Sequence, residues 1–571
     1  MNSRELLHEA RRALGIEQLV LAIHDSSFPG FAGEDLGRGS PYSRGARDLF
    51  AFARSLGFTG VQLGPQGETT LGNRSPYDGT VFAKSVLSID LLGLTRDPDC
   101  AELVDGAIVR DRIAGRPTSV GGDGVQYSYA FRAMREVVKG AWQRFSRSAS
   151  APLRARYDAF RTTNAVWLDH DEAYERATGH FELGDAFAFG QFLVHAQHES
   201  MRAGTAQGGL TMYGDLQVGL SLCDRWRREP LMLAGYAMGA PPSRTDPDGQ
   251  PWGYPVLDPG AREAMVMLEL RVAKMLRELD GLRIDHPHGL VCPWVYDALA
   301  PDPIHAVKHG ARLFASPDLP DHPALARHAI VRPAQLDRSL PRHADGWVRE
   351  LDETQVDAYG TRFDSIVQMM LAAGRDLRGV VCEVLSTQPY PLCRVMDRHG
   401  LGRFRVTQKA NPLDPLDVYR HENARPTDWM MVGNHDTAPL LLVVERWRDE
   451  GVAETRARYL EERLALPRGS LGTDVASLTQ AMFAALFASA ARNVMVFVPD
   501  LLGVRAIYNR PGIVDDVNWT WRVPENFRGV YTDNVARGEA MNVPRAMAMA
   551  LRAKSDATRA RTDLIEALER T

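Results

Sequence analysis

Eight short apolar segments, each ending in polar or charged residues, constrain the fold of this 571-residue chain more than any other feature. Each is short enough to form one buried parallel strand. Helical patterns lie between several of them, at 41–56, 262–279 and 474–492. Strands that alternate with helices in this way are typical of a (β/α)8 TIM barrel, in which active sites lie where the strands end. The eight segments are Leu19–His24, Gly60–Gly64, Leu210–Asp215, Gly281–Asp285, Gly379–Glu383, Phe404–Gln408, Trp429–His435 and Asn493–Pro499.

Uneven spacing between these segments predicts large insertions in the barrel. About 145 residues separate the second segment from the third, and about 95 separate the fourth from the fifth. A barrel helix with its loops needs only a few dozen residues. We therefore expect one catalytic α/β barrel over 1–571, with a helical insertion at 93–208 on the βα-loop side. A second insertion is expected at 293–375, where the Pro-, His- and Asp-rich part 293–351 is predicted to be irregular.

Composition and charge narrow the classes of function. The chain is 44% hydrophobic and 24% charged, with a formal net charge of -5 and scattered basic residues. This balance is typical of a soluble globular protein with an uncharged substrate and predicts no nucleic-acid partner. Charged residues and a proline interrupt the most apolar stretch, 478–501, which predicts a buried helix leading into a buried strand rather than a membrane span. Five cysteines without close-spaced pairs, and an N-terminus unlike a signal peptide, predict a cytoplasmic protein with reduced thiols.

Three acidic residues follow predicted strands and are candidate catalytic groups: Asp285, Glu383 and Asp436. Cleavage of a glycosidic bond with retention needs a nucleophilic carboxylate and a protonated carboxyl group about 5 Å apart. Arg283 lies on the same strand face as Asp285 and is expected to keep it ionised. The apolar residues 380–382 before Glu383 favour a raised pKa, which suits an acid catalyst. For any one of these carboxylates alone, an ordinary ion pair at the barrel mouth is the alternative interpretation.

Several longer motifs, in the same order along the chain, resemble those of glycoside hydrolase family 77, the 4-α-glucanotransferases. The resemblance extends over nearly the whole chain. Its motifs are Ile23–Gly30, Leu63–Pro65 with Ser75–Tyr77, Gly214–Leu216, Gly239–Pro242 with Gly249–Gly253, Asn509–Gly512 and Asn518–Arg522.

The resemblance implies roles for individual residues. Asp285 is similar to the family's nucleophile and Glu383 to its acid/base. Asp436, with His435, is similar to the carboxylate that holds sugar hydroxyls and favours ring distortion. The resemblance further implies that Arg283 and Asn509 are supporting groups, and that neither a metal nor an organic cofactor is needed. The remaining expected substrate-binding residues are Tyr77, Asp215, Gln250 and Trp252.

The same resemblance implies an active-site lid at 216–260. Within it, the proline- and glycine-rich segment Gly239–Gly253 is predicted to be an exposed loop. Trp252 and Tyr77 are candidate platforms for sugar rings, whose apolar C–H faces stack on aromatic side chains. Core packing is the alternative for isolated aromatic residues, and Tyr254 is a weaker candidate platform.

By the resemblance, the expected activity is that of a 4-α-glucanotransferase. It would move α-1,4-glucan segments between malto-oligosaccharide donors and acceptors by a retaining double displacement, with no membrane partner. The oligomeric state is not predicted. An α-glucan hydrolase of the same clan and a catalytically degenerate glucan-binding barrel are the alternatives. Pro287-His288 stands where the family has Phe-Arg, and Ser243 replaces a lid aspartate, so the donor and acceptor preferences stay open.

Three weaker motifs favour structural interpretations. His195, His198 and Glu199 have helical spacing and are expected on a solvated helix face rather than around a metal. Asp246, Asp248 and Gly249 lack the rest of a calcium-loop pattern and predict a turn. The glycine-rich segment 121–124 predicts a flexible turn rather than a phosphate site, because no strand precedes it.

Overall fold

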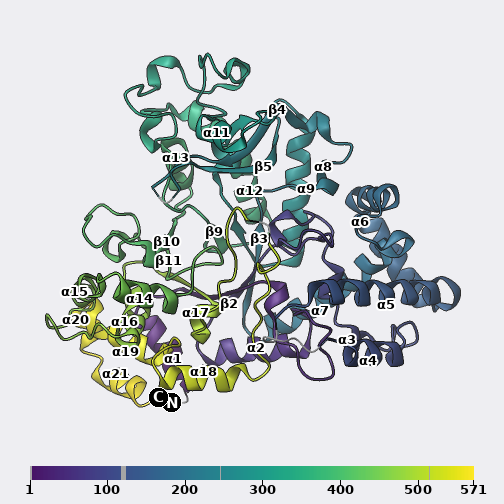
Figure 1. Cartoon of the computed structure of the whole chain (residues 1–571), viewed down its shortest axis with the longest axis horizontal. Coiled ribbons are helices and arrows are strands. Elements are labelled where there is room, and N and C mark those ends of the chain that lie inside the picture. Colours follow the sequence, from purple (N-terminus) through teal and green to yellow (C-terminus); the bar gives the residue numbers. More distant parts are fainter. Residues whose placement is uncertain (1–2, 118–123, 245, 514) are drawn as a thin grey trace. The chain divides into compact units, whose positions relative to one another are not determined.

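All eight apolar segments form β-strands, which confirms the predicted strand set (Figure 1). They are the strands of a (β/α)8 barrel, the predicted fold class. Their bounds in this computed structural model are β1 Gln18–Ile23, β2 Gly60–Leu63, β3 Thr211–Leu216, β6 Gly281–Ile284, β9 Val380–Cys382, β10 Phe404–Val406, β11 Trp429–Met431 and β12 Asn493–Phe497.

The structure describes residues 3–117, 124–244, 246–513 and 515–571, so part of the glycine-rich segment 121–124 lies outside the described residues. The chain forms two units. Unit 1 comprises Met1–Met212, Arg405–Ala424 and Met430–Thr571, and unit 2 comprises Tyr213–Phe404 and Arg425–Trp429.

Unit 1 contains β1 between β12 and β2, with both pairs parallel. Every residue of β2 and β12 is buried, as expected for strands covered on both faces. Helix α2, Arg44–Ser55, begins after Ser43, whose side chain accepts a hydrogen bond from the Ala46 amide. Helix α16, Val475–Ala488, leads into β12, which confirms the predicted buried helix and strand. No helix in the described part of the chain is long and apolar enough to cross a membrane.

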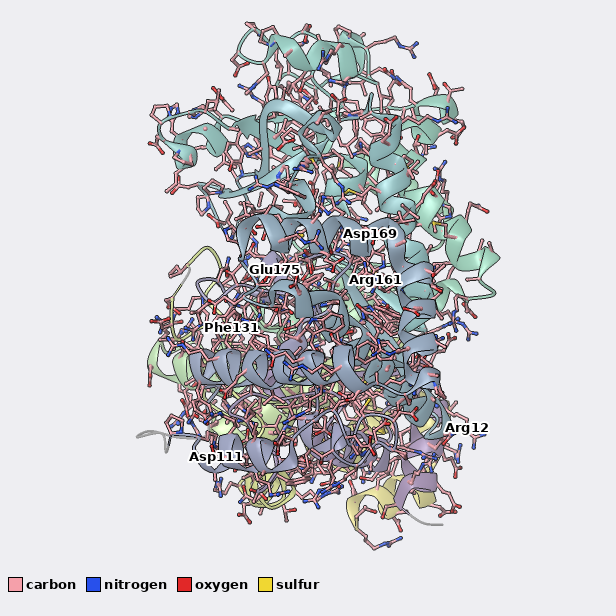
Figure 2. All side chains as sticks on the ribbon, turned by 90° about the vertical axis from the view of Figure 1, so that its right-hand side faces the viewer. Arg12, Asp111, Phe131, Arg161, Asp169 and Glu175 are labelled. Atoms are coloured by element: carbon pink, nitrogen blue, oxygen red, sulfur yellow. The ribbon has the colours of Figure 1, made fainter. Side chains whose placement is uncertain are left out.

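Beyond the single turn of α3 (Leu91–Leu94), the described part of unit 1 has four helices between β2 and β3 (Figure 2): α4 Gly106–Ala114, α5 Tyr127–Ser148, α6 Ala151–Thr178 and α7 Phe187–Gln207. The turn between α6 and α7 is fixed by Glu175. Its carboxylate accepts hydrogen bonds from the amides of Phe181, Leu183 and Gly184 at 2.6–2.8 Å. A buried carboxylate is stable here because three backbone donors replace its water.

The prediction of a solvated face for His195 and His198 was wrong. Both side chains are buried in α7, whereas Glu199 is exposed. The His195 ring stacks on Trp167 with centroids 5.6 Å apart, and Nδ1 of His198 lies 3.3 Å from the Tyr42 hydroxyl. Packing from other helices buries these rings, which helical spacing alone does not reveal.

Unit 2 contains β6 between β3 and β9, again with parallel pairing. Helices α9 Arg262–Glu278, α12 Glu353–Ala372 and α13 Tyr390–Arg398 contribute apolar residues to the core that includes these strands. Asp352 caps α12 through a reciprocal hydrogen-bond pair with Gln355. The three strands therefore rest on a rigid support, and their ends carry the candidate carboxylates.

Unit 2 also contains an antiparallel sheet that was not predicted. Its order is β5-β4-β7-β8, with bounds β4 Met232–Ala240, β5 Gln250–Leu257, β7 Trp294–Asp297 and β8 Ala311–Arg312. The predicted exposed loop Gly239–Gly253 was wrong at both ends, because Ala240 pairs with Gln250 and only 241–249 connect the strands. Pro251 fits in β5 because β5 is an edge strand, where a missing N–H breaks no ladder. Gly249, at φ +75°, ends the connecting turn that was predicted around Asp246.

The remaining α-helices of the described chain have between four and twelve residues. In unit 1, α1 and α21 lie beside one another (Figure 1), and Nζ of Lys554 in α19 donates to the Leu14 carbonyl at 2.7 Å. Their bounds are α1 Ser3–Ala13, α3 Leu91–Leu94, α8 Leu222–Arg225, α10 His288–Val291, α11 Pro303–Lys308, α14 Leu440–Asp449, α15 Ala453–Arg463, α17 Val498–Leu502, α18 Phe527–Ala536, α19 Val543–Lys554, α20 Asp556–Arg559 and α21 Thr562–Glu569.

Candidate active site

Three neighbouring strands of unit 2 bring four predicted site residues together. Asp215 in β3 is in register with Arg283 in β6. Asp285 and Glu383 are the first residues after β6 and β9. The ladder continues through them, because the Asp285 amide donates to Leu216 at 3.1 Å and the Glu383 amide donates to Ile284 at 3.0 Å. Parallel strands ending at one edge thus place all four side chains in one cluster.

The Arg283 guanidinium lies at the centre of this cluster. Its Nη1 is 2.6 Å from both Asp215 carboxylate oxygens and 3.2 Å from Oδ1 of Asp285. Its Nη2 is 2.5 Å from Oε2 of Glu383. All four side chains are buried. One cation therefore faces three carboxyl groups, and this excess of acids favours retention of a proton.

The carboxyl groups of Asp285 and Glu383 offer oxygen atoms within 4.8 Å of each other. Carboxyl groups about 5–5.5 Å apart are typical of retaining glycosidases, and wider pairs are typical of inverting ones. Nε2 of His286 lies 4.0 Å from Oε2 of Glu383. This upper bound is compatible with the close spacing of a retaining pair.

The pKa of Asp285 is raised well above its ordinary value. Burial is the largest cause, the Arg283 charge opposes it, and the carboxyl groups of Glu383 and Asp215 raise the pKa further. Burial and two neighbouring carboxyl groups therefore oppose the ionisation that Arg283 favours, whereas the sequence prediction considered Arg283 alone. The charge on Glu383 thus affects the pKa of Asp285.

The residue after Asp285 has a strained backbone. His286 has φ +39°, which a side chain other than glycine rarely adopts. Its ring lies against Trp252, with centroids 4.8 Å apart. Nε1 of Trp252 donates to Gln250 at 3.0 Å, and Nε2 of Gln250 donates to Asp246 at 2.8 Å. Trp252 and Gln250 are thus linked to the carboxyl pair through His286, which the sequence prediction did not select.

A second group of predicted residues lies in unit 1. Nδ2 of Asn509 donates to Oδ1 of Asp436 at 2.7 Å, and Nε2 of His435 is 3.4 Å from Oδ2. Tyr77 stacks on His435 with centroids 5.0 Å apart and an interplanar angle of 21°. The Asp436 side chain is 36% exposed, so it remains open to a ligand.

Two further rings complete this group. His24 and Trp519 contact His435, with centroids 5.1 and 5.7 Å away. Both belong to motifs noted in the sequence, yet neither was selected as a site residue. Their position in those motifs was the available signal, but a motif does not show which side chains share a surface.

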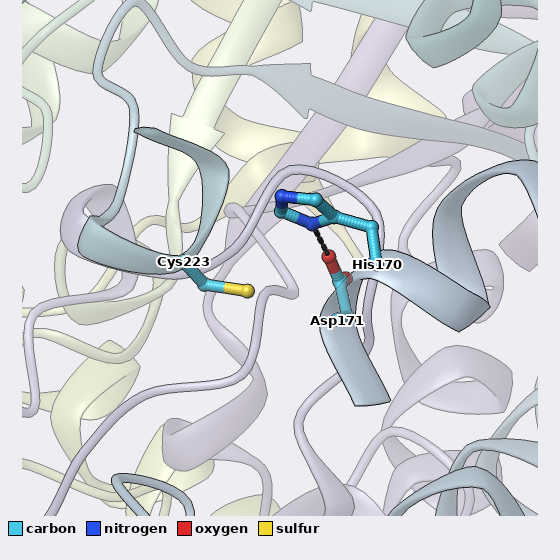
Figure 3. A group of neighbouring side chains, drawn as sticks. All are labelled: His170, Asp171 and Cys223. Carbon is cyan, nitrogen blue, oxygen red and sulfur yellow. Dashed lines mark hydrogen bonds and ion pairs between the residues drawn. The ribbon is translucent and has the colours of Figure 1, made fainter. Parts of the chain in front are cut away.

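Two groups contain side chains of the kinds that bind metals. Asp285, His286 and Glu383 place ligand atoms within 4.8 Å of one another, but Arg283 already contacts both carboxyl groups. Figure 3 shows Nδ1 of His170 hydrogen-bonded to Oδ1 of Asp171 at 2.9 Å within α6 of unit 1. Cys223, also drawn there, is a buried cysteine of α8 in unit 2 that forms no disulfide with the described residues. We assign no metal role to these residues.

A (β/α)8 barrel with two buried carboxyl groups at this spacing has the construction of the retaining glycoside-processing enzymes. The sequence profile described as 4-alpha-glucanotransferase matches residues 171–527. The chain therefore belongs to glycoside hydrolase family 77, which confirms the predicted family.

The chain matches different shares of the known 4-alpha-glucanotransferases. The 4-alpha-glucanotransferase of Thermus thermophilus is 26% identical over 336 residues, which span 51% of this chain and 62% of that protein. The Haemophilus influenzae 4-alpha-glucanotransferase is 33% identical over 122 residues, or 20% of this chain and 17% of that protein. The match thus spans less than two thirds of each relative.

Solved amylomaltase structures have the same fold. The structure of the Streptococcus agalactiae amylomaltase in complex with acarbose aligns with a TM-score of 0.66 at 17% identity, covering 92% of this chain and 99% of that one. The Corynebacterium glutamicum amylomaltase aligns with a TM-score of 0.67 at 17% identity, covering 93% and 76%. At such low identity the likeness shows the barrel fold alone.

Proposed function

We propose that this protein is a 4-α-glucanotransferase that moves α-1,4-glucan segments between malto-oligosaccharides. The observation that carries the proposal is the buried Asp285–Glu383 pair, with oxygen atoms within 4.8 Å, in a chain of this family. Asp285 is the nucleophile and Glu383 is the acid/base. The S. agalactiae relative was solved with acarbose, and a glucan site in this chain accords with that complex.

In the first half of the reaction, Glu383 donates its proton to the glycosidic oxygen while Asp285 attacks the anomeric carbon. The C–O bond to the leaving glucan breaks, and a covalent glycosyl-enzyme forms. Asp285 is the member of the pair suited to ionise, because the Val218 amide donates to its Oδ2 at 3.1 Å. A backbone donor favours the charged form of a carboxyl group, which supports Asp285 as the nucleophile and Glu383 as the proton donor.

In the second half, Glu383 takes the proton of the 4-hydroxyl of an acceptor glucan. That oxygen attacks the anomeric carbon, releases Asp285 and restores an α-1,4 bond. Transfer exceeds hydrolysis only where the acceptor displaces water. Trp252, half-buried beside His286, is the group that we assign to acceptor binding.

The unit 1 group is assigned to sugar binding. Asp436 accepts hydrogen bonds from sugar hydroxyls, as the family resemblance implies, and Asn509 fixes its orientation. Tyr77 supplies an aromatic surface beside His435. All five cysteines are free thiols, a state that accords with action in the reducing cytoplasm.

The residues near Asp285 favour an acceptor preference that differs from that of the family. His288 stands where the family has arginine. Burial, the largest cause, lowers the pKa of His288 to about 3, so the ring is neutral. Its Nε2 donates to the Thr387 carbonyl at 3.1 Å. A neutral ring cannot supply the positive charge and forked hydrogen bonds of arginine, so we expect acceptor selectivity to differ from that of the family.

The roles of the two carboxyl groups can be separated with an α-maltosyl fluoride donor. Fluoride leaves without protonation, so Glu383→Gln should still form the glycosyl-enzyme from this donor while losing turnover of maltotriose. Asp285→Asn should lose both reactions by several orders of magnitude and still bind glucan. An exposed matched variant, Asp248→Asn, should keep both reactions. Full activity in either active-site variant would overturn the assignment.

Products from maltotriose alone separate the proposed function from its rival. Transfer redistributes chain lengths without a net gain of reducing ends, whereas a hydrolase of the same clan raises their number. A rise that matches substrate loss would replace the proposal with the hydrolase. Glucan binding without turnover in the wild type would identify a degenerate binding barrel.

A further inference from the structure

Unit 1 has a cavity of about 560 Å³ that the proposed reaction does not use. It is lined by α2, α7 and the segment from Asp90 to Cys100, which includes α3. Cavities of roughly 300–1,000 Å³ are the size that binds small organic ligands. None of its lining residues belongs to the candidate active site.

Part of the cavity wall is apolar. Its walls include Phe50 of α2, Leu94 of α3, and Phe192 and Leu193 of α7. Aliphatic and phenylalanine side chains provide few of the polar partners that sugar hydroxyls require. The body of a ligand that fits these walls is therefore apolar.

Two of the three arginines that line the cavity have partners. Nη1 of Arg47 donates to the Tyr42 carbonyl at 2.9 Å, and Arg156 forms an ion pair with Asp99. Arg54 differs. Within the described part of the chain its side chain has neither an ion pair nor a hydrogen bond, and its Nε is buried without a partner. A buried Nε donor without an acceptor is costly, so an anion that pairs with Arg54 is favoured.

The surroundings of Arg54 leave room for such an anion. Arg54 lies in the last turn of α2, and its Nη1 is 3.7 Å from where a Cβ would stand on Gly208. Gly204, one turn earlier in α7, has nothing within 4 Å of its own Cβ position. Glycine at both positions keeps side chains away from this side of the guanidinium.

We propose that the cavity binds a small amphipathic carboxylate, whose charged group pairs with Arg54 and whose aliphatic chain lies along Phe50, Leu94 and Leu193. One unpartnered guanidinium matches one negative charge. Its planar fork fits the two oxygens of a carboxylate. The site is separate from the carboxyl pair of unit 2, so it does not depend on the proposed transferase activity.

Titration calorimetry with decanoate, used below its micelle-forming concentration on the full chain, tests this proposal. Wild-type protein should bind decanoate and should bind the neutral analogue decanol more weakly. Arg54→Gln should lower decanoate affinity roughly tenfold or more, since a hydrogen-bonded charge pair is lost. Arg47→Gln is the matched control on the same helix and should change the affinity by less than about twofold. Ala196→Trp, which fills the cavity, should abolish binding.

Three outcomes would overturn the proposal: no decanoate binding by the wild type, equal binding of decanol, or equal losses in the Arg47 and Arg54 variants. Equal losses would indicate a general effect of positive charge. If Arg54→Gln does not fold, Arg54→Lys provides the test, because it keeps the charge without the fork and should weaken binding to an intermediate extent. Glucan turnover is measured separately, so failure of one proposal leaves the other standing.

Discussion

Nη2 of Arg283 lies 2.5 Å from Oε2 of Glu383, so the candidate acid/base is held by the same guanidinium that contacts the candidate nucleophile. Neither carboxyl group can change its charge without affecting the other. The cluster thus couples the two half-reactions electrostatically.

Removing this cation should shift the pH dependence of the reaction. The Arg283 charge lowers the pKa of Asp285, so Arg283→Gln should raise that pKa further. Because attack requires ionised Asp285, activity is lost as pH falls through this pKa, and the acid limb of kcat/KM should move to higher pH. Arg283→Lys keeps the charge and should shift the limb less. An acid limb that stays in place in Arg283→Gln would contradict the coupling.

Asn509 should affect catalysis only through its hydrogen bond to the Asp436 carboxylate. Asn509→Ala removes a donor at 2.7 Å and should lower kcat/KM by roughly tenfold or more. The same change made in an Asp436→Asn background should cost much less, because the charged partner is already absent. Independent effects in this double-mutant cycle would show that Asn509 acts on something else.

Trp252 should influence the balance between transfer and hydrolysis. Trp252→Ala removes about 1 kcal/mol or somewhat more of aromatic contact without touching Asp285 or Glu383. If the ring binds the acceptor, the ratio of hydrolysis to transfer on maltotriose should rise, and Trp252→Phe should restore part of the loss. Tyr236→Ala, in the neighbouring strand β4, is the control. Parallel loss of both activities would instead assign Trp252 to the donor or to folding.

Asp500 should make stability depend on pH. Burial, partly offset by the Leu440 amide, raises its pKa from 3.8 to about 7. The folded state therefore holds a proton that the unfolded state releases, and this contribution to stability, fully present below pH 3.8, is lost as pH rises to about 7. Asp500→Asn keeps the acceptor for Leu440, so its free energy of unfolding should fall less steeply over this range. Chemical denaturation at several pH values measures this free energy. An equal dependence on pH in the wild type and in Asp500→Asn would contradict the prediction.

The barrel strands were predictable because a parallel strand buried on both faces leaves a continuous apolar run, as in β12. The candidate pair was predictable for a related reason. Asp285 and Glu383 are the first polar residues after such runs, and strand ends converge at one edge.

The antiparallel sheet of unit 2 was not predictable in the same way. Pro251 and Gly253 in β5 are typical of loops, and only pairing with β4 makes this segment a strand. The charge balance around Arg283 was also not predictable from the sequence. Asp215 lies on a different strand from Arg283, so the sequence did not show that three carboxyl groups share one cation. The positive φ of His286 has no local signal either, since the residue is not glycine.

The two prolines of β5 have a consequence for solubility. Pro251 and Pro255 lie in the strand at the margin of the antiparallel sheet, where unpaired backbone groups would otherwise invite another chain to add a strand. A proline presents no amide hydrogen, so β5 offers an interrupted template for intermolecular pairing. Replacing both by β-branched residues would create a longer continuous edge, and the protein would become more prone to aggregate without any change at its carboxyl pair.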